Sequence, residues 1–419
     1  MTKLYELNLQ LFAASDYDID YNTNTTGSGG LSAEMKTFYD KVLLKAAKPN
    51  LVHDQFGQDR NIPKNGGKTI EFRKYSGLGK ALTPLTEGKP PKGQDLTVSN
   101  VTATVSQYGG FVTISDVLDL TAIDNNLAEA VELLGDQAGL TLDTITRNVL
   151  NSGTNVSYAS KWSGTTETAV TARNDLDNTS VLKVDTINQV VAKLRSVNAK
   201  PVDGKYYAAI IHPFAAYELM RDPDWKYPHQ YVDTENIYEG EIGRIGGVRF
   251  VESSEAKIFG AETGLKINYA SGYSGSISSV AFDGKLDGKD VEADALIGKY
   301  LRINGVAKRI TDNGTDSIEF ASTSDFGSIA DNTDIEIIPC VAGAVFSTIV
   351  VAKDAYGKTS VDGGGLETIV KTKGQVGGPL EQYMTAGWKA LKTAEILMPD
   401  YLVRVESTST RYSATAETN

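Results

Sequence analysis

The amino-acid sequence predicts an α+β fold that carries an inserted all-β domain, and three patterns in the chain support this prediction. Apolar residues recur every three or four positions over 123–149, as on one face of a long helix. Apolar and polar residues alternate over much of 60–112, which indicates a long β-hairpin. Residues 265–343 contain short strand patterns about every 8–12 residues, which is typical of a small β-sandwich or barrel.

The chain begins with a polar segment. Residues 1–30 are rich in Thr, Asn, Asp and Gly without a helical or strand period, so this arm cannot bury a core of its own. Residues 31–59 contain a first helix and a connection. Ser32 is placed to cap that helix, Phe38 and Val42 lie on its apolar face, and Pro49 ends it.

Residues 60–112 are predicted to form an extended hairpin. Its strands are "KTIEFRKY" and the long ribbon "LTVSNVTATVSQYGGFVTIS". Between them lies "SGLGKALTPLTEGKPPKGQD", whose Gly and Pro residues suit a projecting tip.

Residues 113–182 contain the long helix. Its apolar stripe consists of Ile123, Leu127, Val131, Leu134, Ala138, Leu142, Ile145 and Val149. Asp124 or a neighbour can cap this helix, and Gly153 can stop it. The segment "LNSGTNVSYA" (150–159) then combines a helix end with a defined turn but offers no catalytic base or metal ligand.

Residues 183–264 show a mixed α/β pattern. Asp185 is expected to cap a helix, "YYAAIIHP" is expected to be a short buried strand, and "FAAYELMRDPDW" is expected to be helical. Residues 265–343 interrupt this pattern with the β domain, whose net charge is about −5. Residues 344–419 return to the earlier pattern and end in strands, with a turn at Pro399.

Composition excludes several classes of protein. The net charge of −12 argues against a free nucleic-acid binder, because phosphate contacts demand basic surfaces. The one cysteine, Cys340, cannot form an internal disulfide, and its apolar neighbours indicate a buried strand residue. No run of about 18 apolar residues predicts a transmembrane helix.

No motif predicts catalysis, a cofactor or a metal. "GGKT" at 66–69 lacks the first Gly of a phosphate-binding loop, and a strand follows it instead of a helix. Asp16, Asp18 and Asp20 have calcium-loop spacing but lack the later Gly and Glu. Two turns explain the "FDGKLDGKD" aspartates better than a cation does. The three histidines are not at metal-ligand spacing: His53, His212 and His229.

Several motifs in a fixed order resemble the major capsid protein of tailed bacteriophages. They are "NLQLFA", "GKTIEFRKY", "LTEGKPP", "TRNVLNSGTNVSYA", "IIHPFAAYELMRD", "GEIGRIGGVRFVES", "VAKDAYG" and "GPLEQYMTAGWKALKTAEIL". The resemblance is to the Hong Kong ninety-seven type of shell fold, and within it to the branch typified by the podovirus called N-four. It covers most of the chain except 265–343.

The resemblance implies a role for each segment. Residues 1–30 correspond to the N-terminal arm, 60–112 to the extended loop, 113–182 to the peripheral domain with its spine helix, and 183–264 with part of 344–419 to the axial domain. It further implies self-assembly, as pentamers and hexamers, into an icosahedral head. Portal, scaffolding and decoration proteins are implied partners, the packaged double-stranded DNA is held by confinement, and assembly takes place in the host cytoplasm. No membrane is involved.

Charge is unevenly distributed between the hairpin and the long helix. Residues 60–95 contain eight Lys or Arg against three Asp or Glu, a net of +5, whereas 111–146 contain seven Asp or Glu and no Lys or Arg. We therefore expect the basic loop of one subunit to lie over the acidic helix of the next. The residues proposed for this contact are Lys80, Lys89, Lys92, Asp119, Glu129 and Glu132. The resemblance to tailed-phage capsid proteins, some of which crosslink Lys to Asn between subunits, also makes these loop lysines candidates for such a crosslink, although no acceptor is identified.

Two other functions stay open at this point. The β domain could make the chain a receptor- or carbohydrate-binding virion protein, with Trp162 and Tyr273 as candidate stacking residues. A hydrolase with an unrecognised site is the third possibility.

Overall fold

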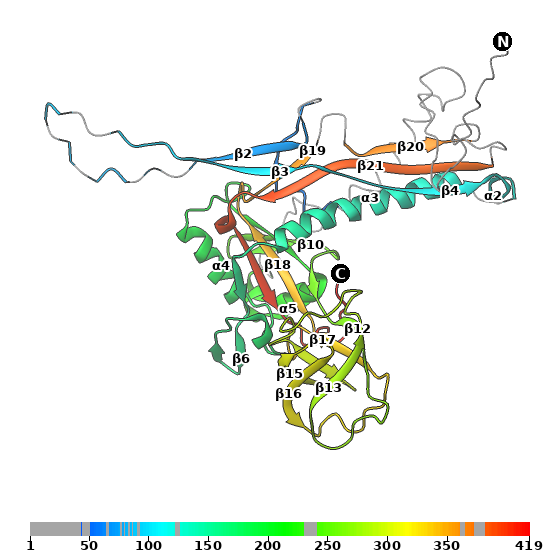
Figure 1. Cartoon of the computed structure of the whole chain (residues 1–419). Coiled ribbons are helices and arrows are strands. Elements are labelled where there is room, and N and C mark those ends of the chain that lie inside the picture. Colours follow the sequence, from blue (N-terminus) through cyan, green and yellow to red (C-terminus); the bar gives the residue numbers. More distant parts are fainter. Residues whose placement is uncertain are drawn as a thin grey trace, which may run out of the picture. The chain divides into compact units, whose positions relative to one another are not determined.

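A computed structural model of the chain describes residues 43, 51–63, 67–75, 78, 80–82, 84, 85, 87–89, 93–121, 126–229, 241–360, 365–372 and 382–419. The arm and the first helix therefore lie outside the described residues, apart from the buried Leu43. The chain divides into two compact units (Figure 1). Unit 1 comprises 1–50, 107–139 and 364–391, and unit 2 comprises 51–106, 140–363 and 392–419. Helices and sheets occur together, so the α+β fold class is confirmed.

A seven-stranded sheet forms the centre of unit 2. Its order is β5-β22-β18-β8-β10-β9, with β11 beside β18. The strands are β5 (Val156–Tyr158), β8 (Tyr207–Ile211), β9 (Glu241–Ile245), β10 (Val248–Glu252), β11 (Ile258–Phe259), β18 (Val345–Val351) and β22 (Leu402–Ser407). Every residue of β8 and β18 is buried, which explains why β8 is continuously apolar and why β18 is apolar apart from Ser347 and Thr348.

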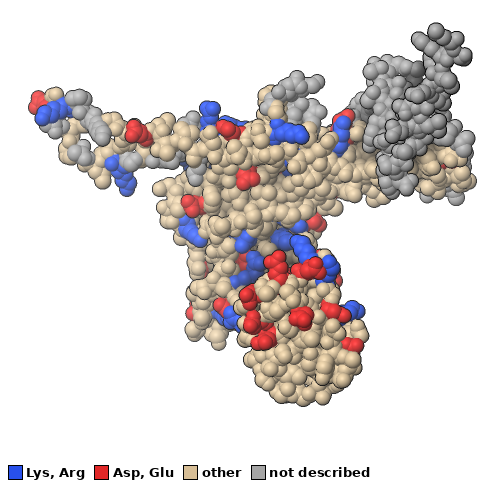
Figure 2. All heavy atoms as spheres, viewed as in Figure 1, with Lys and Arg blue, Asp and Glu red and all other residues tan. Residues whose placement is uncertain are grey.

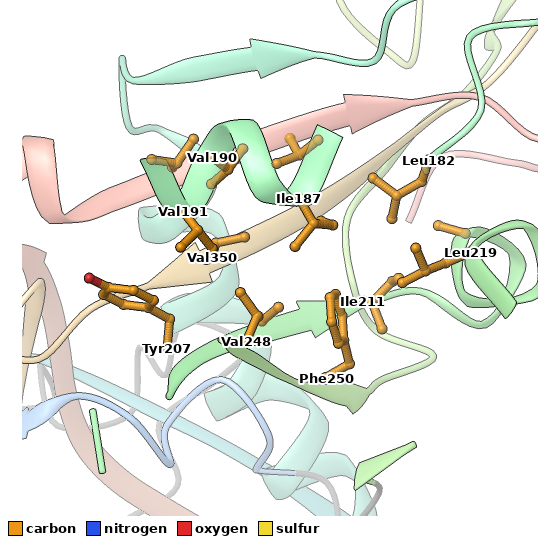
Figure 3. Packing of buried hydrophobic residues seen from close by; sticks show 14 of the residues in the cluster. Leu182, Ile187, Val190, Val191, Tyr207, Ile211, Leu219, Val248, Phe250 and Val350 are labelled. Atoms are coloured by element: carbon orange, nitrogen blue, oxygen red, sulfur yellow. The ribbon is translucent and has the colours of Figure 1, made fainter. Parts of the chain in front are cut away.

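Both faces of this sheet are covered. On one face, Ile187 and Val191 of α4 (Val184–Ser196) point towards Val248 and Val350 of the sheet (Figure 3). Helix α5 (Pro213–Arg221) adds Leu219 to the same core.

On the opposite face, Ala208 and Ile210 of β8 pack against Phe56, Leu150 and Tyr356. The alternation of side chains along a strand thus supplies two separate cores.

The start of α4 differs from the sequence prediction. Its N-cap is Lys183, and Asp185 lies in the first turn instead of capping the helix. The backbone N–H of Val184 donates to the carboxylate of Asp222, 3.0 Å away. The Asp222 carboxylate, which is distant in sequence, therefore takes the place of a local N-cap side chain. It accepts a hydrogen bond from an N–H group that has no partner within the helix.

The inserted domain is a closed six-stranded barrel with the order β12-β13-β16-β15-β14-β17. The strands are β12 (Glu262–Ile267), β13 (Ile277–Gly284), β14 (Tyr300–Ile303), β15 (Val306–Asn313), β16 (Ser317–Thr323) and β17 (Asp334–Ile338). It has a separate apolar core that includes Leu265, Phe282 and Ile337. The first strand starts before residue 265, because Glu262 pairs with Ile337 and begins the barrel.

Unit 1 is built around the long strand β21 (Tyr383–Ile396), which continues into unit 2. In unit 1, β21 pairs with β20 (Glu367–Lys371) and with β4 (Ser106–Ser115). The unit also contains α2 (Asp116–Thr121) and most of α3 (Asn126–Asn151). In unit 2, β21 pairs with β19 (Tyr356–Ser360), which pairs with β1 (Gln58–Asp59).

The remaining short elements belong to unit 2. They are β2 (Thr69–Tyr75), β3 (Val98–Thr104), β6 (Lys161–Ser163), β7 (Thr166–Thr168), η3 (Arg173–Asp175), α6 (Pro223–His229) and η4 (Pro399–Tyr401).

Candidate functional site

The extended hairpin is formed by β2 and β3, which pair antiparallel from Thr69↔Thr104 to Tyr75↔Val98. One face is apolar, since Phe72 and Ala103 are buried together with Leu397. The hairpin is shorter than the sequence predicts, because β4 does not continue the ribbon and instead pairs with β21. The alternating pattern runs through both strands, so periodicity alone could not reveal that the chain changes partner after Thr104.

The tip of the hairpin, residues 76–97, exposes large apolar side chains. Leu78 is 61% exposed, Leu82 82%, Leu85 75% and Leu96 61%. Lys80 and Lys89 are exposed among these leucines, whereas Lys92 lies outside the described residues. The charge pattern of the sequence indicated the lysines but not the leucines. The only sign of the leucines in the sequence is that they are apolar residues in a segment too rich in Gly and Pro to form a core. Such a group of exposed apolar residues indicates an interaction surface.

Helix α3 presents a mixed acidic and apolar face to solvent. Glu129 and Glu132 are exposed. Leu133 is 68% exposed and Leu140 37%. Residues three, four or seven positions apart share a helix face, so these four side chains form one stripe. The side chain of Asp119, on α2, is not among those described.

The structure brings the two glutamates together on α3 and places the two lysines in one tip. Among the ion pairs of the described residues, none involves Lys80, Lys89, Glu129 or Glu132. The expected contact between lysines and glutamates joins two copies of the chain, so it stays a prediction.

The last half of α3 differs from its first half. Ile123 and the possible cap Asp124 lie outside the described residues. From Leu127 the predicted apolar stripe holds as far as Leu142, but the buried face then shifts to Asp143, Thr146 and Arg147, while Ile145 and Val149 are only half-buried. Asp143 is therefore not part of an acidic surface.

Buried polar partners explain this shift. Asp143 accepts hydrogen bonds from the backbone N–H of His53 at 2.7 Å and binds its ring Nδ1 at 2.6 Å. Asp54 accepts from the Thr146 hydroxyl at 2.6 Å and pairs with Lys392. Because a buried charge is stable only when it is paired, these residues fix the segment after residue 50 to the helix.

A second buried ion cluster lies at the end of β22. Glu406 is fully buried and accepts two hydrogen bonds of 2.6 Å from the Arg173 guanidinium. Arg404 Nε lies 2.9 Å from the same carboxylate, and the Arg173 guanidinium lies 3.6 Å from the centre of the Phe259 ring. Burial acts to lower the pKa of Arg173, but the hydrogen bonds and charge of Glu406 outweigh burial and raise that pKa.

Helix α3 ends as the "LNSGTNVSYA" segment predicts, and the turn there is structural. The buried Asn151 side chain donates to the Arg147 carbonyl at 2.8 Å and accepts from the Ser347 hydroxyl at 2.6 Å. The chain then enters β5, which pairs with β22.

The structure places His212 and Cys340 in structural roles. The His212 ring accepts from the Phe214 N–H at 3.1 Å and caps α5, and burial lowers the pKa of His212 to about 4. The His229 side chain is not described. Burial also raises the pKa of Cys340 to about 11, so its thiol stays protonated near neutral pH.

Two aspartates of "FDGKLDGKD" also have structural partners. Asp287 accepts from the Thr263 N–H in a turn, and Asp290 pairs with Lys285 at 3.1 Å. No group of three or more His, Cys, Asp or Glu suited to a metal ion occurs in the described part of the chain. "GGKT" leads into strand β2, although Gly66 itself is not described. Asp16, Asp18 and Asp20 also lie outside the described residues.

The described helices include none that is both long and apolar enough to cross a membrane.

A comparison with protein families decides between the possible functions. Residues 99–334, more than half of the chain, match the model of a family described as phage capsid protein. The chain belongs to the phage capsid protein family. This capsid protein is a structural protein and not an enzyme: a major capsid protein that associates with copies of itself to form the icosahedral head of the virion. No curated protein matches it at a significant level.

Solved structures of phage shells are distantly similar to this capsid protein. The capsid of Ralstonia phage GP4 is 12% identical, with 95% of this chain and 98% of that chain covered and a TM-score of 0.48. The cyanophage Pam1 capsid is 11% identical, with 94% of this chain and 98% of that chain covered and a TM-score of 0.48. The head structure of Helicobacter pylori bacteriophage KHP40 is 11% identical, with 96% of this chain and 100% of that chain covered and a TM-score of 0.45. The family assignment rests on the family match and not on these similarities.

Proposed function

We propose that this capsid protein assembles as pentamers and hexamers, and that the hairpin tip of each subunit lies over the exposed face of α3 of its neighbour. The observation that carries the proposal is the match between these two surfaces. The tip exposes leucines beside Lys80 and Lys89, and α3 exposes leucines beside Glu129 and Glu132.

The two kinds of side chain contribute differently to such a contact. Fully burying one leucine stabilises by about 1.5–3 kcal/mol, whereas an exposed ion pair contributes about 0–1 kcal/mol. The leucines therefore supply most of the affinity. The charges fix the register and speed the encounter, because complementary potentials act before contact.

The same proposal assigns roles to the other segments. Residues 1–30 act as an arm on a neighbouring subunit, 113–182 form the peripheral domain, and 183–264 with part of 344–419 form the axial domain. Portal, scaffolding and decoration proteins complete the head, which is assembled in the host cytoplasm. Double-stranded DNA is held by confinement, because a net charge of −12 gives phosphate little attraction. We place the chain in the branch typified by the podovirus called N-four on its sequence motifs.

Charge reversal tests the contact between tip and helix. Replacing Lys80, Lys89 and Lys92 by Glu is expected to slow or block assembly, with the subunit still folded, because like charges would then meet. Light scattering during assembly at low salt measures the rate. The defect should shrink as salt is raised, since the screening length is only about 10 Å at 0.1 M.

Reciprocal reversal makes this test specific. Adding Glu129→Lys and Glu132→Lys to the reversed tip should restore assembly. The matched control reverses three exposed lysines of the barrel, Lys266, Lys285 and Lys289, and should assemble at the normal rate. If the reversed tip assembles normally at low salt, or if the second reversal does not rescue it, the tip does not lie on α3.

Deleting the barrel tests whether it is a module on the outer surface. Glu262 and Ile337 are paired neighbours in adjacent strands, so a short Gly/Ser bridge can rejoin the chain after removal of 263–336. We expect the shortened chain to stay soluble and to assemble, as seen by negative-stain microscopy, because the barrel has its own core. Complete loss of soluble protein would place the barrel in the shared core instead.

A further inference from the structure

The barrel has one end that lies away from its attachments to the rest of unit 2. All neighbouring strands of the barrel are antiparallel, so successive loops alternate between its two ends. The chain enters before Glu262 and leaves after Ile338 at one end. The loops 268–276, 304–305 and 324–333 therefore lie at the other end, which we call the distal end.

Two tyrosines form a fixed platform at the distal end. The rings of Tyr269 and Tyr273 are stacked, with centroids 4.7 Å apart and planes inclined by 28°. Tyr269 is 47% exposed and forms the outer ring. Its backbone N–H donates to Asp331 at 2.9 Å, and its carbonyl accepts from the Gly272 N–H at 2.7 Å.

The inner ring is held equally firmly. Tyr273 exchanges two backbone hydrogen bonds with Ile329, of 2.8 and 2.9 Å, and its hydroxyl accepts from the Ala281 N–H at 2.9 Å. Gly272 has φ +64, and a Cβ at this position would lie 2.5 Å from the Ile329 carbonyl oxygen. The loop is therefore built in one conformation, which lowers the entropy lost when a ligand binds.

Neutral polar groups surround the platform. Asn268, Ser271 and Ser274 are exposed in the same loop as the two tyrosines. The three distal loops contain no Lys or Arg, and their only charged residues are Asp325 and Asp331. Asp325 pairs with Lys308. The lowest part of the barrel in Figure 2 shows no charged side chain on the visible face.

This chemistry selects the kind of partner. The absence of basic residues in the distal loops argues against nucleic acid and other polyanions. The other large apolar residues of these loops, Phe326 and Ile329, are buried in the barrel core, so the exposed apolar area is too small to suit the centre of a protein interface.

We propose that the distal end of the barrel binds a neutral glycan. A pyranose ring presents a face of C–H groups, which can stack on Tyr269, and hydroxyl groups at its rim, which can bond to Asn268, Ser271, Ser274 and Asp331. The exposed Asp331 carboxylate can accept further hydrogen bonds, because one of its oxygens accepts from the Tyr269 N–H and the other from the Asn332 amide, and each oxygen has two lone pairs. Rings that are apolar on the face and polar at the edge suit such ligands.

Saturation-transfer NMR on the full-length protein tests this proposal. The probes are neutral hexasaccharides of glucose, galactose, mannose and N-acetylglucosamine, with an oligomer of sialic acid as the anionic arm. We expect saturation of the ring protons of at least one neutral probe. Tyr269→Ala should raise its Kd by about tenfold, and Tyr269→Phe, which keeps the ring, should leave it within about twofold.

The matched control is Tyr383→Ala, because Tyr383 is equally exposed at 47% but belongs to unit 1. It should bind like the unaltered chain. The proposal is overturned if none of the neutral probes binds, if only the sialic acid oligomer binds, or if Tyr269→Ala binds as well as Tyr269→Phe. An equal thermal midpoint for the three variants shows that a loss of binding is not a loss of folding.

Discussion

Replacing Glu406 by alanine is expected to lower the free energy of unfolding by about 3–5 kcal/mol. The Glu406 carboxylate is fully buried, and the guanidinium groups of Arg173 and Arg404 both lie against it. Its loss leaves two positive charges side by side without a counter-charge. Glu406→Gln should cost less, because the amide oxygen can still accept a hydrogen bond from Arg173.

The matched control for Glu406 is Glu367→Ala. Glu367 pairs with Lys389 at 3.1 Å, but about half of each side chain is exposed, and such a pair contributes only about 0–1 kcal/mol. Denaturant titration of the unassembled chain, followed by tryptophan fluorescence, compares the variants. Equal losses for Glu406→Ala and Glu367→Ala would show that the buried cluster has no special importance.

Gly109→Val is expected to destabilise unit 1 by about 1–3 kcal/mol and to prevent normal assembly. A Cβ at Gly109 would lie 2.6 Å from the backbone carbonyl oxygen of Trp388, so strands β4 and β21 would have to move apart. The neighbouring Gly110 is less confined, because the atom 2.7 Å from its Cβ position is the side-chain oxygen of Gln137, which can move more easily than backbone. Valine favours strands, so any loss of stability must come from this close approach.

Gly365→Val is the matched control for Gly109. It belongs to the same unit, and nothing lies within 4 Å of a Cβ built on it. Hydrogen exchange of β4 and β21 should increase in the Gly109 variant and stay unchanged in the control. Unchanged protection in both variants would mean that unit 1 tolerates a wider spacing of these strands than its geometry indicates.

Local patterns predicted the individual elements well. The stripe from Leu127 to Leu142 marked α3, and the short strands of 265–343 marked the barrel, because both patterns reflect a face that is buried by one nearby core. The residues Lys80, Lys89, Glu129 and Glu132 were identified by charge alone and are exposed as a surface contact requires.

Features that depend on distant residues could not be predicted. The change of partner after Thr104, the Asp222 carboxylate at the start of α4 and the pairing of His53 with Asp143 all join segments far apart in the chain. The segment "GEIGRIGGVRFVES" forms the local hairpin β9–β10. Gly246 and Gly247 both have positive φ there and make the tight turn.

An electron cryomicroscopy reconstruction of particles assembled from the purified chain would show where the hairpin tip of each subunit lies. We expect a closed icosahedral shell of pentamers and hexamers in which residues 78–89 of each subunit lie over Glu129, Glu132 and Leu133 of its neighbour. Particles in which the hairpin tip contacts only its own subunit, or a chain that forms no closed shell, would overturn the proposed contact and assembly.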